Sequence, residues 1–197
     1  YLKLPPRERA RKLSFLPQIR TIIPTLPVKT LVEHGRFPYL GFSRKKTAED
    51  ISIVQKAMEF THISQYADQY VDTLSGGIRQ RVFFAMTLAQ DCDTIVLDEP
   101  VTYLDLQGQK DFFDMLFLLR RQKKTIILTL HDLSHAIRIS DQLIVMEKSG
   151  KENSDMPYAG KIAAWGTPVE CLPAIEKIFC TKHKKFEDKE GTYYFFG

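Results

Sequence analysis

The sequence has 197 residues, of which 44% are hydrophobic and 26% charged, and its formal net charge is +4. This length and composition allow a substantial core, so we expect one globular unit, with at most two subdomains. The small charge and scattered basic residues give no reason to expect nucleic-acid binding, and no apolar run approaches the roughly 18 to 20 residues that span a bilayer, so we expect a soluble chain.

The first part of the chain predicts a strand, a loop and two helices. Residues 13–18, "LSFLPQ", are a short apolar run that we expect to form a strand ending at Gln18. Two prolines then break residues 19–31 into a loop, and a short helix over residues 28–35 is expected to stop at Gly35. Thr47 should cap the next helix, because "TAED" places an acidic residue three positions after a hydroxyl.

A further helix is predicted over residues 77–90, "GIRQRVFFAMTLAQ". Its arginines, Arg79 and Arg81, should lie on a solvated or interface face, and its apolar face should point inward through Val82, Phe83, Ala85, Met86 and Ala89. Residues 28–91 therefore predict a compact, mostly helical part of the chain that is too short for coiled-coil arms.

From residue 92 the pattern changes to strands alternating with helices. Amphipathic stretches predict helices at residues 110–122, 133–140 and 168–179, and a last strand is predicted at 192–196. Continuous apolar runs predict buried strands at residues 94–97, 125–130 and 142–146. This alternation indicates an α/β fold with parallel strands and right-handed crossovers. The polar stretch 147–160 predicts a turn or a mobile hairpin.

The three cysteines, Cys92, Cys171 and Cys180, are odd in number and have no close metal-ligand spacing. We expect ordinary buried or surface thiols in a reducing compartment rather than a disulfide or a metal site.

Two carboxylates close the first buried strand after residue 92. "TIVLDEP" places Asp98 and Glu99 at the carboxyl end of that strand, where ligands bind in open α/β sheets. One carboxylate there can hold the magnesium of a nucleotide while its neighbour deprotonates an attacking water. Acidic residues can also simply close a strand, so the pair by itself leaves both interpretations open.

The stretch "LSGG" at residues 74–77 predicts an anion site at the start of a helix. Two glycines there expose backbone N–H groups, and the helix dipole and the Ser75 hydroxyl assist them. Ser-Gly-Gly also makes flexible turns, so the order of the surrounding residues carries more weight than the four letters. Upstream of it lies Gln18, at a strand end, and downstream follow Asp98, Glu99, Asp105 and His131.

In this order, the motifs resemble the nucleotide-binding subunit of an ABC transporter, over roughly its last three quarters. "LPQ" resembles the Q-loop, "LSGGIRQR" the signature motif, "TIVLDEP" the Walker B strand, "VTYLD" the D-loop and "TLHD" the switch histidine. "VEHGRFPYLGF" and "FFAMTLAQ" are most similar to importers of iron-siderophore, haem and cobalamin type. The resemblance implies a P-loop NTPase-like (ABC ATPase) core over residues 1–27 and 92–197, with a helical signature subdomain over 28–91.

The resemblance also implies roles in hydrolysis. Gln18 would contact the magnesium ion and the attacking water, where a transmembrane permease pushes on the helical insertion. Asp98 would hold magnesium through water, and Glu99 would act as general base. His131 would bind the γ-phosphate and order the transition state.

Other residues would act across a dimer. Ser75, Gly76 and Gly77 would bind the γ-phosphate of ATP held by a second nucleotide-binding subunit, most simply an identical chain, and Asp105 would join the two active sites. The resemblance therefore implies ATP and magnesium as cofactors and a transmembrane permease as a further partner. It implies no nucleic acid, and a peripheral place on the cytoplasmic face of the cell membrane.

The chain departs from the family pattern in two ways. Ile78 stands where the family usually has a glutamine, from which we expect a modest loss of nucleotide contact. The 197 residues contain no "GxxxxGK[ST]" loop and no early aromatic to stack on adenine. Family spacing places that loop upstream of Tyr1. Without its amides and lysine most phosphate-binding energy is gone, so we expect this chain to be inactive alone.

Two other functions remain open. A non-transport ABC ATPase acting on DNA or ribosomes is disfavoured by the short helical insertion and by the lack of a basic stripe. A non-hydrolysing module that supplies "LSGG" in trans is disfavoured by Glu99 and His131, because such a module has no need of a base.

Overall fold

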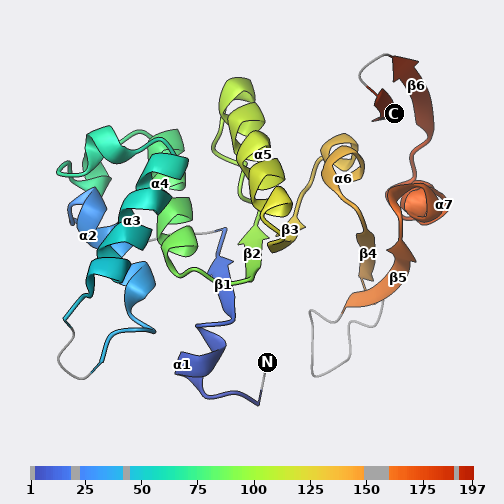
Figure 1. Ribbon diagram of the computed structural model, residues 1–197. Coiled ribbons are helices and arrows are strands. Elements are labelled where there is room, and N and C mark those ends of the chain that lie inside the picture. Colours follow the sequence, from blue (N-terminus) through green and yellow to red (C-terminus); the bar gives the residue numbers. More distant parts are fainter. Residues whose placement is uncertain (1–2, 19–22, 42–44, 149–159, 189–190) are drawn as a thin grey trace. The chain divides into compact units, whose positions relative to one another are not determined.

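The computed structural model describes residues 3–18, 23–41, 45–148, 160–188 and 191–197. The chain divides into two compact units, Tyr1–Thr129 and Leu130–Gly197, and Figure 1 labels most of their helices and strands. Part of the predicted proline-containing loop, residues 19–22, lies outside the described residues, as do residues 149–159 of the predicted polar turn.

A parallel sheet of three strands in the order β1-β2-β3 organises the first unit. The strands are β1 (Leu13–Leu16), β2 (Thr94–Asp98) and β3 (Thr125–Thr129). The prediction that β1 reaches Gln18 was wrong by two residues, because Pro17 has no N–H for the ladder. All three strands run the same way, with Leu16 opposite Leu97 and Asp98 opposite Thr129, so their carboxyl ends meet at one edge of the sheet.

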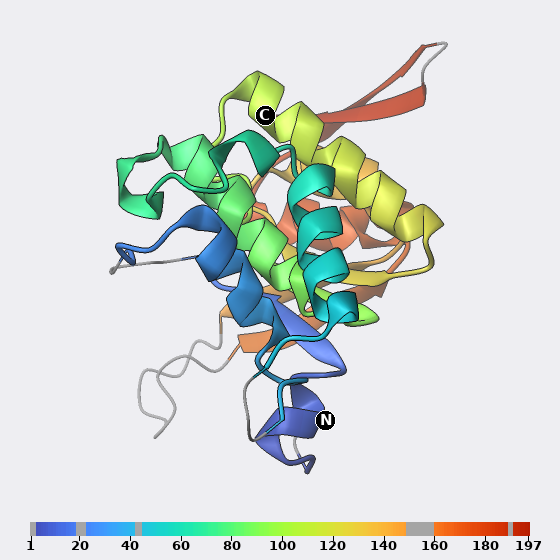
Figure 2. The ribbon, with the colours of Figure 1, turned by 60° about the vertical axis from the view of Figure 1, so that its left-hand side comes forward.

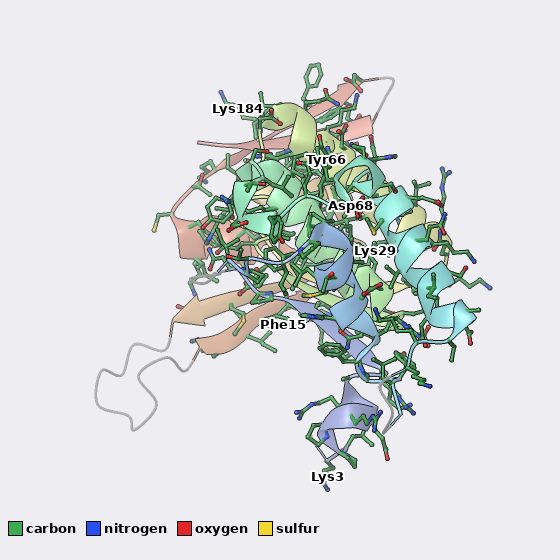
Figure 3. All side chains as sticks on the ribbon, turned by 90° about the vertical axis from the view of Figure 1, so that its left-hand side faces the viewer. Lys3, Phe15, Lys29, Tyr66, Asp68 and Lys184 are labelled. Atoms are coloured by element: carbon green, nitrogen blue, oxygen red, sulfur yellow. The ribbon has the colours of Figure 1, made fainter. Side chains whose placement is uncertain are left out.

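The two faces of this sheet differ in burial. Phe15, Val96 and Ile127 align across the strands on one face, and there both Phe15 (labelled in Figure 3) and Ile127 are 51% exposed. On the other face Leu16 and Leu97 are fully buried. The prediction of a buried strand at residues 125–130 was therefore wrong for β3. It lies at an edge of the described sheet, and its side chains alternate between exposed and half-buried.

Short helices fill the segment between β1 and β2, and α1 (Pro6–Arg9) precedes β1. The helices α2, α3 and α4 contact one another and run side by side in Figure 2. The predicted capping box of α3 is confirmed, because Thr47 Oγ1 accepts from the Asp50 amide at 3.1 Å and the Asp50 carboxylate accepts from the Thr47 amide at 2.9 Å. The elements are α2 (Val28–Glu33), η1 (His34–Arg36), α3 (Ala48–Phe60), η2 (Ser64–Tyr66), η3 (Val71–Thr73) and α4 (Gly76–Ala89).

Helix α4 is buried on more than one side. The predicted inward residues Val82, Phe83, Ala85 and Ala89 are buried, whereas Met86 is only half-buried, against the prediction. Phe84, which the periodicity did not single out, is fully buried and meets Phe112 of α5 (Leu106–Arg121) with ring centroids 4.6 Å apart. A helix that packs against both α3 and α5 has no single apolar stripe.

The prediction that Gly35 stops the helix was wrong. Helix α2 already ends at Glu33, and Gly35 lies inside η1, which runs to Arg36. A Cβ atom at this position would lie 2.3 Å from the backbone oxygen of Met86 and 2.9 Å from the Cβ of Ala89. The glycine therefore permits the close approach of η1 to α4.

Replacing Gly35 with alanine is expected to lower the free energy of unfolding by about 1–3 kcal/mol, because the added methyl group must push the backbone of α4 away. The matched control is Gly41→Ala, whose Cβ would meet nothing within 4 Å. Urea unfolding of both variants checks this expectation. Equal midpoints for the two variants would show that η1 can move aside without cost.

The second unit packs two hairpins against two helices, the predicted helices at residues 133–140 and 168–179. The predicted strand at 142–146 does not join a parallel sheet among the described residues, since β4 pairs antiparallel with β5. Strand β6, which pairs with β7, was not predicted because its sequence "HKKFED" is mostly charged. The elements are α6 (Leu133–Ile139), β4 (Leu143–Lys148), β5 (Gly160–Gly166), α7 (Pro168–Phe179), β6 (His183–Asp188) and β7 (Gly191–Phe196). The core consists of Ile137, Val145, Cys171, Leu172 and Ile175.

The three cysteines are free thiols; Cys92 and Cys171 are buried and Cys180 is exposed. Burial, and next the negative charge of Asp91, raise the pKa of the Cys92 thiol to about 11. A thiol with so high a pKa is a poor nucleophile at neutral pH. In the described part of the chain, no helix is both long and apolar enough to cross a membrane.

Candidate active site

Residues that are far apart in sequence meet where the strands of the first unit end. Gln18 lies just beyond β1, Asp98 ends β2, Glu99 follows it and Thr129 ends β3; we call these four residues the carboxyl edge. The side-chain amide of Gln18 donates a hydrogen bond to Glu99 Oε2. Both side chains are half-buried, so a small ligand at this edge can reach them.

The backbone of Glu99 is held in an unusual conformation. Its φ of 47° lies in the left-handed region, which costs roughly 1–2 kcal/mol for a residue with a Cβ. Its N–H donates to Thr129 Oγ1 at 2.9 Å, and the Thr102 hydroxyl lies 3.2 Å from its carbonyl oxygen and 3.3 Å from its Oε2. Strain of this kind persists where surrounding contacts enforce it, and it is common at functional sites.

The oxygen atoms at the carboxyl edge suit a magnesium ion that arrives with a nucleotide. Asp98 is half-buried, and its Oδ1 accepts from Thr129 Oγ1 at 2.6 Å. Because Gln18 uses its nitrogen toward Glu99, its amide oxygen can face a cation. The described residues contain no group of three or more His, Cys, Asp or Glu that could hold a metal ion. Magnesium commonly needs only one or two carboxylates when phosphates complete its shell.

The start of α4 has the form of an anion site. Ser75 is the N-cap residue, and its Oγ accepts from the Ile78 amide at 3.5 Å. A Cβ on Gly76 would meet nothing within 4 Å, so the space beside this residue is open. The backbone N–H groups of the first helical turn have no acceptor within the helix, and they and the helix dipole can bind a phosphate group.

Several contacts join α4 to the loop that follows Glu99. Gln80 Nε2 donates to the Pro100 carbonyl oxygen at 2.8 Å, and the Cβ position of Gly77 lies 3.5 Å from Leu104 Cδ2. Gln80 was not singled out from the sequence, where its only signal is its position one turn into the helix after the glycines. The loop that carries Glu99 is thus braced by the helix that carries "LSGG".

Arg81 was predicted to lie on a solvated or interface face, but it forms an ion pair with Asp111 of α5 at 2.8 Å. A hydrogen bond from Arg81 is the main cause that lowers the pKa of the Asp111 carboxyl. This pair links α4 to α5 and gives the arginine a structural partner.

The remaining predicted site residues lie at helix starts. Asp105 caps α5, its Oδ1 accepting from the Gly108 amide at 2.7 Å, and it is exposed. His131 is exposed in the second unit, two residues after Thr129, and the next residue, Asp132, caps α6 by accepting from the His135 amide at 2.8 Å. Within the first unit, Gln18, Asp98 and Glu99 therefore lie together. Asp105 follows Leu104, whose Cδ2 lies 3.5 Å from the position that a Cβ on Gly77 would take.

The family model described as "ABC transporter" matches residues 4–102, about half of the chain. The chain belongs to the ABC transporter family. The resemblance drawn from the motifs is confirmed, and so is the α/β ABC ATPase fold class.

Curated relatives of this ABC transporter chain include proteins named for siderophore transport. The probable siderophore transport system ATP-binding protein YusV of Bacillus subtilis (strain 168) is 43% identical over 180 residues, which are 90% of this chain and 62% of YusV. The ferric enterobactin transport ATP-binding protein FepC of Escherichia coli (strain K12) is 40% identical over 176 residues, or 88% of this chain and 61% of FepC. The chain thus spans about three fifths of the length of these relatives.

Solved structures show the same fold. An ABC transporter in an inward-facing conformation matches with a TM-score of 0.78 at 22% identity, over 94% of this chain and 72% of that one. The bacterial ABC transporter cassette MJ0796, solved as a dimer, matches with a TM-score of 0.61 at 27% identity, over 70% of this chain and 60% of that one. The same cassette has also been solved as a dimer in a post-hydrolysis state bound to ADP and Pi.

Proposed function

We propose that the protein containing these residues is the ATP-binding and ATP-hydrolysing subunit of an ABC importer, and that the importer carries iron-siderophore or related chelates. The observation that carries the proposal is the contact between Gln18 and Glu99 beside Asp98, at the carboxyl ends of parallel strands. The choice of cargo is supported by the names of YusV and FepC. The permease, not this chain, would select the transported molecule.

The geometry suits hydrolysis by an activated water. Glu99 would act as general base, because its carboxylate is half-buried and is held by hydrogen bonds from Gln18 and Thr102. A base fixed in this way can take the proton of a water as that water attacks. Gln18 would orient the same water. His131 would bind the γ-phosphate from its position at the start of the second unit.

ATP and magnesium are the proposed cofactors. Asp98, through water, and the amide oxygen of Gln18 would hold the metal ion. When bound, the ion neutralises charge on the phosphate oxygens. Thr129 keeps the Asp98 carboxylate in place through the 2.6 Å hydrogen bond.

The proposed partners are a second nucleotide-binding subunit, most simply an identical chain, and a transmembrane permease. Ser75, Gly76 and Gly77 would bind ATP held by the second subunit, since the space beside Gly76 is open. Asp105 would join the two sites, because its exposed carboxylate follows Leu104, a residue that lies near Gly77 at the start of α4. The subunit would lie on the cytoplasmic face of the cell membrane.

We also propose that residues 1–27 and 92–197 belong to the ATPase core and residues 28–91 to a helical signature subdomain. The mutual packing of α2, α3 and α4 supports this division. The 197 residues contain no glycine-rich loop with lysine, so the chain in isolation is expected not to hydrolyse ATP.

The experiment that tests the function uses the native gene product, expressed from its whole coding sequence with and without a candidate permease. MgATP hydrolysis is measured on purified protein, and uptake of labelled ferric siderophore is measured in cells with and without the gene. The proposal expects both activities, and expects the coding sequence to encode Gly-Lys-Ser or Gly-Lys-Thr in a glycine-rich loop. Hydrolysis by a protein that never purifies with membranes would instead indicate a non-transport ATPase.

A further inference from the structure

The hydroxyl of Thr129 contacts both acidic residues at the end of β2. Thr129 Oγ1 donates to Asp98 Oδ1 at 2.6 Å and accepts from the Glu99 N–H at 2.9 Å. These two contacts follow from the register, which places Thr129 directly opposite Asp98 in the parallel pair of β2 and β3. They lie within one compact unit.

The chemistry of the hydroxyl fixes what each contact does. A hydroxyl has one proton, and an ionised carboxylate can only accept, so the proton of Thr129 is committed to Asp98. The Glu99 N–H then occupies a lone pair on the same oxygen. One side chain therefore orients the Asp98 carboxylate and satisfies the backbone of a residue held at a φ of 47°.

We infer that Thr129 is a positioning residue for ATP hydrolysis, which holds Asp98 in the orientation that accepts the hydrated cation and holds Glu99 in the backbone conformation that aims its carboxylate at the water. This inference rests on the proposed function. Thr129 acts through Asp98 and Glu99 and touches neither nucleotide nor water in this role.

A simple preference of threonine for strands does not account for these contacts. Thr125, at the other end of β3, is also exposed and points to the same face of the sheet, four residues earlier. Its side chain has no hydrogen bond among those observed in the described residues, whereas that of Thr129 has two. Thr125 therefore provides a matched control for the same substitution on the same strand.

The test compares Thr129→Val, Thr129→Ser and Thr125→Val in the native gene product. Valine keeps the shape of threonine and removes the hydroxyl, whereas serine keeps the hydroxyl. Thr129→Val is expected to lower kcat at saturating MgATP by about ten-fold and to raise the magnesium concentration needed for half-maximal rate, because a hydrogen bond to a charged group is lost. Thr129→Ser is expected to stay within about three-fold of the wild type, and Thr125→Val to be unchanged.

A second readout needs no nucleotide. Amide hydrogen exchange at Glu99 is expected to be at least about ten-fold faster in Thr129→Val than in the wild type, because the N–H loses its acceptor. In Thr129→Ser, whose hydroxyl can still accept from the Glu99 N–H, this amide is expected to exchange as slowly as in the wild type.

The outcomes separate the two ideas. A wild-type protein without ATPase activity defeats the proposed function, and with it this inference. An active wild type, combined with an unchanged kcat and magnesium dependence in Thr129→Val, overturns the inference alone. Unchanged exchange at Glu99 in that variant overturns it too, because the contact would then not hold the backbone.

Discussion

Replacing Glu99 with glutamine is expected to lower the rate of ATP hydrolysis by the native gene product about 10²–10⁴-fold, because the variant keeps the shape of the side chain and removes the proton acceptor. Glutamine can still meet Gln18 and Thr102, whose side chains both contact the Glu99 carboxylate, so the fold should survive. ATP should then be bound but not consumed. Steady-state hydrolysis, gel filtration with ATP and circular dichroism check the three parts of this expectation.

The control for this variant is Glu49→Gln, in the first turn of α3, where an exposed glutamate loses its charge far from the carboxyl edge. Its hydrolysis rate should equal that of the wild type. The expected Glu99→Gln protein is a stable ATP-bound dimer. A variant that hydrolyses ATP at the wild-type rate would remove Glu99 from the role of base, and would favour a module that only supplies its signature motif to a partner.

The order of motifs predicted the family correctly because that order reflects chemistry. A strand that ends in two carboxylates and a helix that begins with two glycines are each encoded by a few consecutive residues, so each can be recognised in the sequence alone. The structure then shows Gln18 in contact with Glu99, although nothing between them in sequence relates the two. Parallel strands place their ends at one edge, which is why a correct strand assignment implied that neighbourhood.

The sequence did not predict features that depend on contact between distant segments. Gly35 reads as a helix stop, yet its missing Cβ matters because Met86 and Ala89 lie against it. Thr129 reads as one residue of an apolar strand predicted over residues 125–130, and the role of its hydroxyl follows only from the register with Asp98. Strand β6 is mostly charged, and it forms because β7 supplies hydrogen-bond partners.

The burial of side chains in the predicted strands was predicted less well than the strands themselves. A continuous apolar run such as residues 125–130 indicates a strand with two covered faces, but Ile127 is 51% exposed. The composition of the run does not show that β3 lies at an edge of the described three-stranded sheet, where its side chains alternate between exposed and half-buried. This difference does not affect the carboxyl edge, whose residues are placed by backbone pairing rather than by the burial of side chains.

Replacing Arg36 with methionine is expected to lower the free energy of unfolding by about 3–5 kcal/mol, because it leaves a buried carboxylate without its cation. The Nε of Arg36 lies 2.8 Å from Asp50 Oδ1, and the two side chains are only 5% and 7% exposed. The guanidinium also donates to the Ala89 carbonyl oxygen at 3.0 Å and lies over the Tyr39 ring, 3.9 Å from its centroid. Methionine replaces only the aliphatic part of the arginine side chain, so both hydrogen bonds that the guanidinium donates are lost.

The matched control is Lys29→Met on α2, which removes an exposed cation (Figure 3) from the same helical part of the chain. Surface charges of this kind contribute roughly 0–1 kcal/mol, so its midpoint in urea should be close to that of the wild type. Equal midpoints for the Arg36 and Lys29 variants would mean that the guanidinium does not stabilise the buried carboxylate.

The pH dependence of the Arg36 variant tests the cause. Hydrogen bonds from Thr47, and next from Arg36, lower the pKa of the Asp50 carboxyl below its ordinary value, although burial opposes them. A carboxyl with a lowered folded pKa contributes stability above its unfolded pKa of about 3.9 and loses that contribution as the pH falls through the folded value. In Arg36→Met the folded pKa of Asp50 rises, so Asp50 is protonated at a higher pH. The difference in stability between wild type and variant is therefore largest at neutral pH. It should shrink as the pH falls through the folded pKa of Asp50 in the variant, because the variant then no longer buries a charge, and the wild type loses its ion pair only at a lower pH. A difference that stayed constant down to pH 3 would assign the loss to the Ala89 hydrogen bond and the Tyr39 contact instead.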